Sequence, residues 1–427
     1  MQAKKQQADP AQEIQEFLRA RFKPNFGRNR QRFRTDPVWS RLRELGSELW
    51  LDTGNIVEAD SLWTREFAAL TTNNTLLNKE VQTGRYDGLI LESATILSAY
   101  PALTEQQRIR EIAFILNAWH ALRLVEKFDA YVSVEEHTDV AHDIEQSVHY
   151  ARRFHRVCPQ RFIVKIPFTP AGLLATRRVS PEGIPVNHTL GFSARQNYLI
   201  ASIGQPAYVN VFLGRLNSFI AVNGLGDGRY VGEKATLASQ KAVRQLRPKL
   251  GIPTRQIGAS FRAGAQVGDL AGIDVMTMPP AVAQEFLAST PFLDELVDRT
   301  AAAYVPGLKA GIRPEEIALD TLWEIDTALV DAVEALRKQD LDVFTGQMLI
   351  NFFKDHDCGD LLVSWSDSQI RTSAAEGKIP KVQNWKQALA SKTIGLDSLM
   401  NLAGLNSFAA DQKAMDTRIR QVLAKHK

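Results

Sequence analysis

The residue of this sequence with the clearest chemical potential is a lysine inside an apolar run. Phe-Ile-Val precedes Lys165 at 162–164, and Ile-Pro follows it at 166–167. Lysine is rarely buried unless it has a partner or a chemical role, because burying an unpaired ammonium costs on the order of several kcal/mol. Burial disfavours the charged form of an amine, and an uncharged amine attacks carbonyl carbon. We therefore predict that Lys165 is a nucleophile.

Further polar residues stand at or just after the ends of predicted β-strands. In a parallel β/α barrel the carboxyl ends of the strands form the active site, so this pattern predicts one polar cavity. The polar candidates are Asp52, Thr71, Asn73, Glu135, Asn187, Thr189, Asn210, Arg215, Ser260 and Arg262, and the aromatic Phe212 lies among them.

Strand alternation sorts these candidates, because residues two apart on a strand share a face. Asn187 and Thr189 therefore share a face, and His188 points the other way. The same rule pairs Asn210 with Phe212 and Ser260 with Arg262.

Each candidate taken alone also has a structural explanation. A strand-end Asp or Thr more often caps a turn or a helix than acts as a catalyst. Glu135 is equally consistent with a surface charge, and Arg215 and Arg262 with ordinary ion pairs. We expect His188 to pack against a helix. Lys165 is the residue that fits a structural role least well.

Eight β-rich runs alternate with amphipathic helical segments, a pattern typical of parallel β/α units. We predict an α/β fold, a (β/α)8 TIM barrel with additional N-terminal and C-terminal helices; a doubly wound open sheet is the main alternative. The runs lie at 48–53, 67–74, 130–136, 161–167, 184–192, 207–215, 254–262 and 272–280.

Two regions extend beyond the barrel, which we place at 46–300. Residues 1–45 form a predicted helical extension whose basic run at 23–37 we expect to be a solvated surface. Residues 301–427 form a predicted helical region that packs on the barrel, and the whole stretch from about 282 onward reads as helical. Within it, Leu322, Ile325, Leu329 and Val333 have helical spacing and predict one buried face.

Composition narrows the class of protein. The 427 residues include 51 basic and 48 acidic side chains, and a formal charge of +3 gives no argument for nucleic acid or an anionic membrane. No apolar run is long enough to span a bilayer, and the N-terminus has no signal-peptide core. Two distant cysteines fit a reducing compartment. We expect a cytoplasmic protein, and we read the acidic Asp355–Cys358 segment as a polar loop rather than a metal site.

The sequence resembles the transaldolases, enzymes that use a lysine Schiff base. The resemblance covers residues 48 to 280 in order, with one further block near the C-terminus. "VKIP" followed by Thr169 and Gly172 is fairly specific to the family. The matching blocks are LDTGN (51–55), TTNN (71–74), VSVE (132–135), VKIPFTPAGLLA (164–175), EGIPVNHTLGFSARQ (182–196), VNVFLGR (209–215), GASFR (258–262) and SFAADQKAMDTRI (407–419).

The resemblance implies catalytic roles for four residues. Lys165 would form the Schiff base, and Asp52 would take the proton from the C4 hydroxyl during carbon–carbon cleavage. Glu135 and Thr189 would hold the water that moves protons during Schiff-base formation and hydrolysis. These roles suit the residue types, since an iminium accepts the electrons of the cleaved bond and proton transfer needs a positioned carboxylate or water.

The resemblance also implies the substrates. The reaction would transfer a dihydroxyacetone unit from sedoheptulose 7-phosphate or fructose 6-phosphate to glyceraldehyde 3-phosphate or erythrose 4-phosphate, in the pentose phosphate pathway. It requires no cofactor and no metal. Asn73 and Asn187 would bind the dihydroxyacetone part, and Thr71, Asn210 and Phe212 would also line the substrate site. Arg215, Ser260 and Arg262 would bind phosphate, which arginine forks suit.

Two alternatives remain open. Related fructose 6-phosphate aldolases have Gln and Tyr where Glu135 and Phe212 stand, so this chain resembles the transferases at both positions. However, Asn210-Val211 replaces the family's usual Ser-Pro, and the helices after residue 300 are additional. These departures leave open an aldolase or lyase for another sugar phosphate. A non-catalytic barrel that binds partners is a third hypothesis. The sequence leaves homo-oligomer formation undecided.

Overall fold

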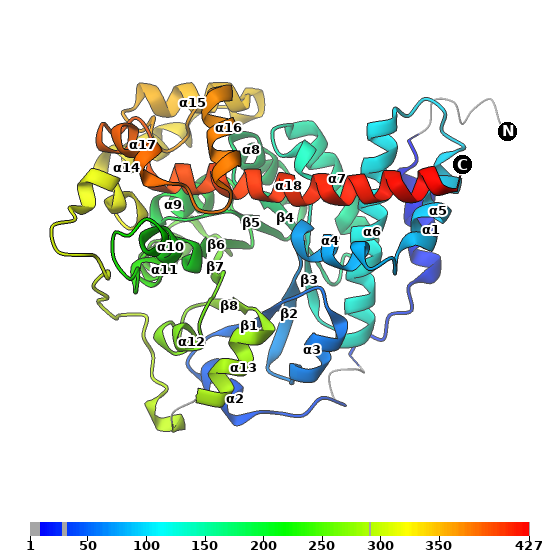
Figure 1. Cartoon of the computed structure of the whole chain (residues 1–427), viewed down its shortest axis with the longest axis horizontal. Coiled ribbons are helices and arrows are strands. Elements are labelled where there is room, and N and C mark those ends of the chain that lie inside the picture. Colours follow the sequence, from blue (N-terminus) through cyan, green and yellow to red (C-terminus); the bar gives the residue numbers. More distant parts are fainter. Residues whose placement is uncertain (1–8, 28–31, 290–291, 427) are drawn as a thin grey trace.

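The computed structural model describes residues 9–27, 32–289 and 292–426. In this part of the chain, eight parallel strands close into a barrel in the order of the sequence (Figure 1). Because β1 pairs with β8, the open sheet is excluded and the predicted (β/α)8 barrel is confirmed. The strands are β1 (Glu48–Asp52), β2 (Phe67–Thr71), β3 (Tyr131–Glu135), β4 (Phe162–Pro167), β5 (Val186–Thr189), β6 (Tyr208–Phe212), β7 (Arg255–Ala259) and β8 (Val275–Met278).

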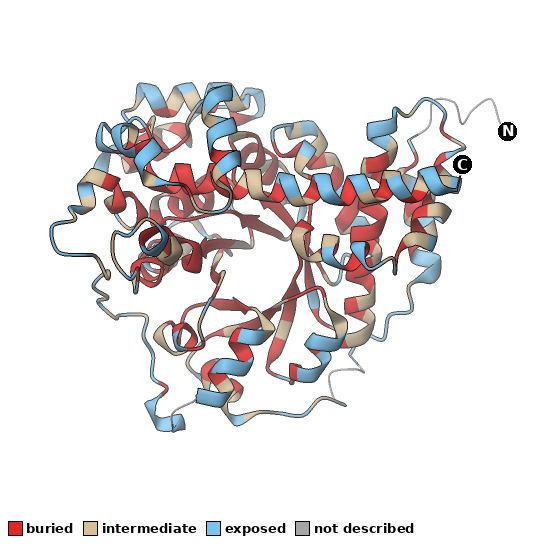
Figure 2. Cartoon of the chain, viewed as in Figure 1, coloured by how far each residue is buried: buried red, intermediate tan, exposed pale blue. Residues whose placement is uncertain are grey.

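The strand register places candidate residues next to one another. Lys165 on β4 lies opposite Glu135 on β3 and Asn187 on β5. Asp52 on β1 lies opposite Thr71 on β2. The strands are almost entirely buried (Figure 2), which explains their nearly continuous apolar sequences. The barrel thus brings polar side chains from separate strands to one end of an apolar core.

Helices connect the strands on the outside of the barrel, and polar caps define where several begin. Thr169 caps α8 by accepting the N–H of Gly172, and Thr104 forms a capping box at α6. The helices are α3 (Ile56–Leu62), α4 (Asn74–Gln82), α5 (Asp87–Leu97), α6 (Glu105–Phe128), α7 (Ile144–Val157), α8 (Pro170–Val179), α9 (Ala194–Ile203), α10 (Leu213–Val222), α11 (Val231–Leu250), α12 (Ala265–Asp269) and α13 (Pro280–Ser289).

The N-terminal extension is only partly helical. It contains α1 (Ala11–Arg21) and α2 (Pro37–Glu44), whereas the described residues between them are not α-helical. α2 begins sharply because Asp36 caps it and Pro37 occupies its first turn. Residues 28–31 of the predicted basic surface lie outside the described residues.

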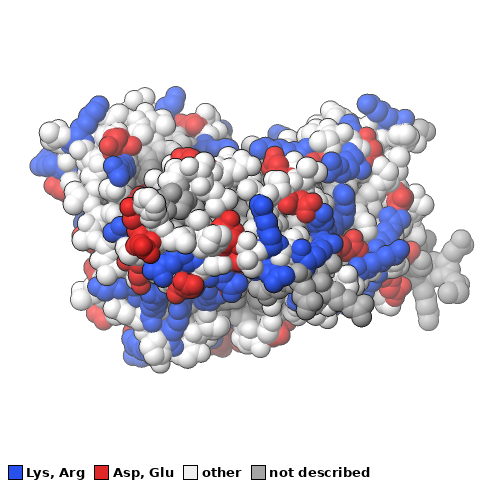
Figure 3. All heavy atoms as spheres, turned by 90° about the horizontal axis from the view of Figure 1, so that it is seen from below, with Lys and Arg blue, Asp and Glu red and all other residues white. Residues whose placement is uncertain are grey.

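The prediction that the chain is wholly helical from about 282 onward is wrong after α13. Residues 296–313 form an extended connection, the yellow-green chain at the left margin of Figure 1, and 3-10 turns follow it. Pro306, Gly307, Gly311 and Pro314 disfavour helix there. The predicted helical face is also broken, since Leu322 ends a 3-10 turn and α14 (Thr327–Leu336) begins only after the cap Asp326.

The C-terminal helices pack on the barrel. They are α14, α15 (Gly346–Asp355), α16 (Asp367–Glu376), α17 (Val382–Ala390) and α18 (Leu396–Lys425). α18, red in Figure 1, contacts α4, α5 and α6. Its Asn401 amide donates to the carbonyls of Phe168 and Leu190, which follow β4 and β5. α18 therefore lies across the carboxyl ends of the strands.

Surface properties agree with a near-neutral composition. On the face shown in Figure 3, Lys and Arg side chains gather in a band but are interspersed with Asp and Glu. Of the helices that the structure describes, none has the length and apolar character required to span a bilayer.

Candidate active site

A cavity of about 140 Å³ lies at the carboxyl ends of the strands. Among its lining residues are all the predicted site residues except Glu135 and Thr189. The predicted residues that line it are Asp52, Thr71, Asn73, Lys165, Asn187, Asn210, Phe212, Arg215, Ser260 and Arg262. Residues from β1, β2, β4, β5, β6 and the segment after β7 thus converge at one place.

The Lys165 amine is buried beside a carboxylate. Lys165 is 4% exposed, and its Nζ donates a hydrogen bond to the carbonyl of Thr72 at 3.2 Å. The Glu135 Oε1 lies 3.9 Å from Nζ. The amine therefore has a charged partner and still faces the cavity, which answers how the barrel holds a lysine inside an apolar strand.

Glu135 lies behind this amine, in the wall of the barrel. Its Oε2 accepts the backbone N–H of Asn74 at 2.9 Å, and Oε1 has no hydrogen-bond partner among the described residues. Burial raises the pKa of the Glu135 carboxyl, and the nearby Lys165 ammonium opposes that rise. Oε1 is free to accept a proton or a hydrogen bond from a water molecule.

Asp52 belongs to a second polar group, which is carried by β1, β2 and β8. Its Oδ1 accepts the Thr71 hydroxyl at 2.7 Å, and the Thr71 hydroxyl is also 2.7 Å from that of Thr277 on β8. These contacts fix the carboxylate at the cavity edge. Thr277 lines the cavity but was not among the predicted residues.

A pair of hydrogen-bonded amides from β5 and β6 also lines the cavity. The Asn187 amide donates to the Ser133 hydroxyl at 3.1 Å, and its Oδ1 accepts from Asn210 at 3.1 Å. Asn210 also donates to the carbonyl of His188 and accepts from the N–H of Gly191. Asn210, the departure from the family pattern, is therefore held tightly by its neighbours.

Two of the predicted site residues, Asn73 and Thr189, are held within the fold more than the others. Asn73 caps α4, since its Oδ1 accepts the N–H of Leu76 at 2.8 Å, which leaves its amide group for the cavity. The Thr189 side chain is fully buried, and its hydroxyl finds no partner within the described part of the chain. His188 turns outward as alternation predicts: it contacts Thr176 on α8, and burial lowers its pKa to about 3.

Arg215, Ser260 and Arg262 form a cationic end of the cavity. Ser260 and Arg262 lie beyond the end of β7, so strand alternation does not explain why both reach the cavity. Ser260 has a positive φ of 65°, a strained conformation for a serine. Gly214 permits this geometry, because a Cβ there would lie 2.1 Å from the Ser260 carbonyl oxygen.

Arg215 is buried, at 7% exposed, and its Nη1 has no hydrogen-bond partner among the described residues. Burial, followed by the nearby Arg262, lowers the pKa of its guanidinium to about 10. A buried cation with an unused donor is arranged to receive an anion. The Ser260 hydroxyl, also buried without a partner in the described chain, adds a second unused donor.

Two lining residues come from the C-terminal region and were not predicted. Phe408 on α18 lies with its ring centre 5.8 Å from the Lys165 Nζ and 5.5 Å from the Arg215 guanidinium carbon. Lys378, between α16 and α17, lines the cationic end. Phe408 lies in the 407–419 block that resembles the family, but nothing in that block indicates that its ring reaches the cavity, and Lys378 has no local signal at all, because each residue reaches the cavity only through tertiary packing.

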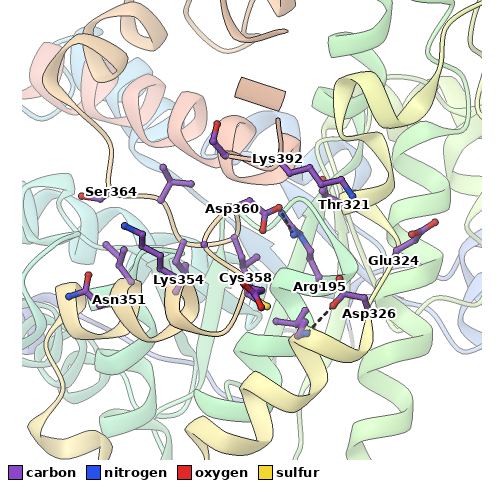
Figure 4. A pocket seen from close by; sticks show the side chains of 18 of the residues that line it. Arg195, Thr321, Glu324, Asp326, Asn351, Lys354, Cys358, Asp360, Ser364 and Lys392 are labelled. Carbon is purple, nitrogen blue, oxygen red and sulfur yellow. Dashed lines mark hydrogen bonds and ion pairs between the residues drawn. The ribbon is translucent and has the colours of Figure 1, made fainter. Parts of the chain in front are cut away.

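A larger cavity of about 830 Å³ lies among the C-terminal helices (Figure 4). Its Arg195 is paired with Asp360 and Asp397, and burial raises the pKa of its Cys358 thiol to about 11, which disfavours the reactive thiolate. No metal-binding group of three His, Cys, Asp or Glu occurs in the residues described. We assign no chemistry to this cavity.

Comparison with known proteins gives consistent matches. The model of the family described as "Transaldolase/Fructose-6-phosphate aldolase" matches residues 49–339. A transaldolase of Xanthomonas campestris pv. campestris is 28% identical over 321 residues, which are 72% of this chain and 98% of the relative. One of Thermosynechococcus vestitus is 28% identical over 280 residues, 63% of this chain and 68% of the relative. One of Trichormus variabilis is 25% identical over 310 residues, 70% and 91% respectively.

Proposed function

This chain belongs to the transaldolase/fructose-6-phosphate aldolase family, and from that premise we propose that it transfers a dihydroxyacetone unit from a ketose phosphate to an aldose phosphate through a Schiff base on Lys165. The observation that carries the proposal is the Lys165 amine itself, 4% exposed and 3.9 Å from Glu135, in a polar cavity with a cationic end. The donor would be fructose 6-phosphate or sedoheptulose 7-phosphate.

In the first half of the proposed reaction, the Lys165 amine attacks the donor's C2 carbonyl and forms a carbinolamine. Loss of water, with a proton delivered from the Glu135 side, gives the iminium. Asp52 then takes the proton of the C4 hydroxyl, the C3–C4 bond breaks, and its electrons move into the iminium to give an enamine. The aldose phosphate leaves. Asp52 suits this role because it lines the cavity and the Thr71 hydroxyl fixes the position of its carboxylate.

The second half reverses these steps with a new acceptor aldehyde. The enamine attacks glyceraldehyde 3-phosphate or erythrose 4-phosphate, Asp52 returns the proton to the new hydroxyl, and water hydrolyses the iminium. We assign the activation of that water to Glu135, with the Thr189 hydroxyl as its second contact. Both carry an oxygen without a hydrogen-bond partner in the described residues, which is available to a water molecule.

The remaining residues would hold the substrate. Asn187 and Asn210 present amides to the cavity, and Arg215, Ser260 and Arg262 offer donors to the phosphate. Phe212 has no acidic proton to give to the enamine, so the intermediate should wait for an acceptor. The chemistry proposed needs no cofactor, since the iminium itself accepts electrons. A cytoplasmic location remains our prediction, supported by two free, buried cysteines.

The test is transfer activity. With fructose 6-phosphate and erythrose 4-phosphate, we expect sedoheptulose 7-phosphate and glyceraldehyde 3-phosphate in equal amounts. Lys165→Arg should abolish both, whereas Lys127→Arg, a surface control paired with Asp60, should retain activity. No turnover by the wild type would reject the proposal.

A second candidate is an aldolase that releases free dihydroxyacetone, because Asn210 replaces the serine usual among transaldolases and both ends of its amide are already hydrogen-bonded. The same assay without an acceptor separates the two functions. Free dihydroxyacetone formed equally fast with and without erythrose 4-phosphate would favour the aldolase.

A further inference from the structure

One cation of the candidate active site comes from outside the barrel. Lys378 lies in the loop at 377–381 that connects α16 to α17, and it lines the same cavity as Arg215 and Arg262. α16 packs against α18, which lies across the carboxyl ends of the strands, and this packing brings the loop to the cavity (α16 and α17, orange in Figure 1). The C-terminal region therefore adds a charge to the site.

The loop is attached to the barrel helix that carries Arg215. Asn223, at the end of α10, donates its amide to the carbonyl of Pro380 at 2.9 Å. Its Oδ1 accepts the N–H of Val382 at 2.8 Å. Arg215 is in the first turn of α10. One helix thus fixes the positions of both cations.

The loop is also braced from its own side. The Glu376 carboxylate accepts the N–H of Lys381 at 3.1 Å and the Trp385 indole N–H at 2.9 Å. Gly377 turns the chain with a positive φ of 78°, and Pro380 is buried. These contacts hold the backbone on both sides of Lys378, whose exposed side chain lines the cavity, so the place of the loop is a built feature of the fold.

The charges at this end of the cavity are not balanced by ion pairs. Lys378, Arg215 and Arg262 make no ion pair with any carboxylate of the described residues. Burial, followed by Arg215, lowers the pKa of Lys378, and Asp411 opposes that change from α18. Lys79 also faces Lys378 and adds repulsion. Like charges held together are unfavourable unless an anion joins them.

We propose that Lys378 is a third cationic contact to the substrate's phosphate, beside Arg215 and Arg262, so that preference for phosphorylated sugars depends in part on the C-terminal region. This inference rests on the function proposed above. A phosphate carries nearly two negative charges at neutral pH and has three acceptor oxygens. Two arginines and Lys378 bring three positive charges to this cavity, which outweigh the charge of one phosphate, and with the Ser260 hydroxyl they offer donors to its acceptor oxygens.

Phosphate binding tests the assignment without requiring catalysis. We would titrate the full-length protein with inorganic phosphate by calorimetry. For Lys378→Gln we expect the dissociation constant to rise about fivefold to tenfold, the effect of one screened charge-assisted contact. Lys378→Arg should restore most of the affinity. The matched control is Lys381→Gln, which removes the same charge from the same loop but does not line the cavity.

A second variant and a kinetic measurement protect the result from misfolding. Asn223→Ala keeps every charge but releases the loop, and we expect it to weaken phosphate binding about twofold to fivefold. In turnover, Lys378→Gln should raise KM for fructose 6-phosphate by a larger factor than it raises KM for unphosphorylated fructose.

Equal phosphate affinity in Lys378→Gln and Lys381→Gln would overturn the assignment of Lys378. The proposed function fails by a different readout: a wild type that binds phosphate through Lys378 but transfers no dihydroxyacetone would support the anion contact and reject the transaldolase.

Discussion

We predict that the buried charge of Arg215 lowers the free energy of unfolding of the protein without bound phosphate, so that a variant without this charge is more stable. The guanidinium is buried and has no ion pair in the described residues, and burial lowers its pKa to about 10. The perturbation we choose is Arg215→Met, which keeps an unbranched apolar stem of similar length. If the site is built for an anion, removing the cation should stabilise the empty protein and abolish the response to phosphate.

The magnitude follows from the pKa. A fall of the arginine pKa from its ordinary value to about 10 corresponds to a cost of about 3 kcal/mol for holding the charge in the folded state. The rings of Phe212 and Phe408 lie 5.4 Å and 5.5 Å from the guanidinium carbon, near the outer limit of about 6 Å for such contacts, so each returns only about 0.5–1 kcal/mol. We expect Arg215→Met to raise the free energy of unfolding by about 1–2 kcal/mol.

The sign depends on pH in a defined way. The charged form is the one that the fold disfavours, so the cost is complete at pH 7, well below the folded pKa of about 10. The cost decreases only as pH rises through about 10 toward the ordinary pKa of arginine, because the folded arginine loses its proton before the unfolded one does.

The assay is urea unfolding at pH 7 in phosphate-free buffer and again with phosphate. At 100 times its dissociation constant, phosphate should stabilise the wild type by about 2.7 kcal/mol, and Arg215→Met by much less. Arg262→Met is the control for an exposed cation: it should lose phosphate response with little gain in stability. A less stable Arg215→Met that responds to phosphate as the wild type does would refute the reasoning.

Three further predictions concern other parts of the site. Glu135→Gln should lower kcat about 100-fold and should remove the loss of activity that the wild type shows on acidification, because burial raises the pKa of this carboxyl and it takes up a proton at a higher pH than an ordinary glutamate. A variant whose pH–rate profile keeps the acidic limb of the wild type would contradict this. Gly214→Ala should lower the free energy of unfolding by about 1–3 kcal/mol, measured in urea, because its Cβ would collide with the Ser260 carbonyl; an unchanged midpoint would mean that the loop moves freely. His188→Asn should leave the pH–rate profile of transfer unchanged, because His188 faces Thr176 and not the cavity; an altered profile would place the ring in the reaction.

The barrel could be predicted from the sequence because its signals are local. Parallel strands buried on both faces are short apolar runs, and each of the eight predicted runs contains an observed strand. Polar residues at strand ends then converge by topology alone, which is why Asp52, Lys165 and Asn187 share a cavity. The domain boundaries at residues 45 and 300, and the catalytic roles, stay predictions.

The parts of the site and fold that the sequence did not predict depend on tertiary packing. Lys378 and Phe408 are more than 200 residues beyond Lys165 in sequence and reach it only because α16 and α18 fold back over the strand ends. Helical spacing from Leu322 to Val333 suggested one helix, but Asp326 caps a new one within that stretch. The positive φ of Ser260 is similarly invisible in its residue type, since serine rarely adopts it.

The central claim is that the Lys165 amine forms an imine with a keto sugar phosphate. The most direct measurement is borohydride reduction of the protein with fructose 6-phosphate, followed by mass spectrometry of its peptides. We expect a covalent adduct on the peptide that contains Lys165, and no adduct in Lys165→Arg. A wild type that remains unlabelled, or is labelled at a different lysine, would contradict the account.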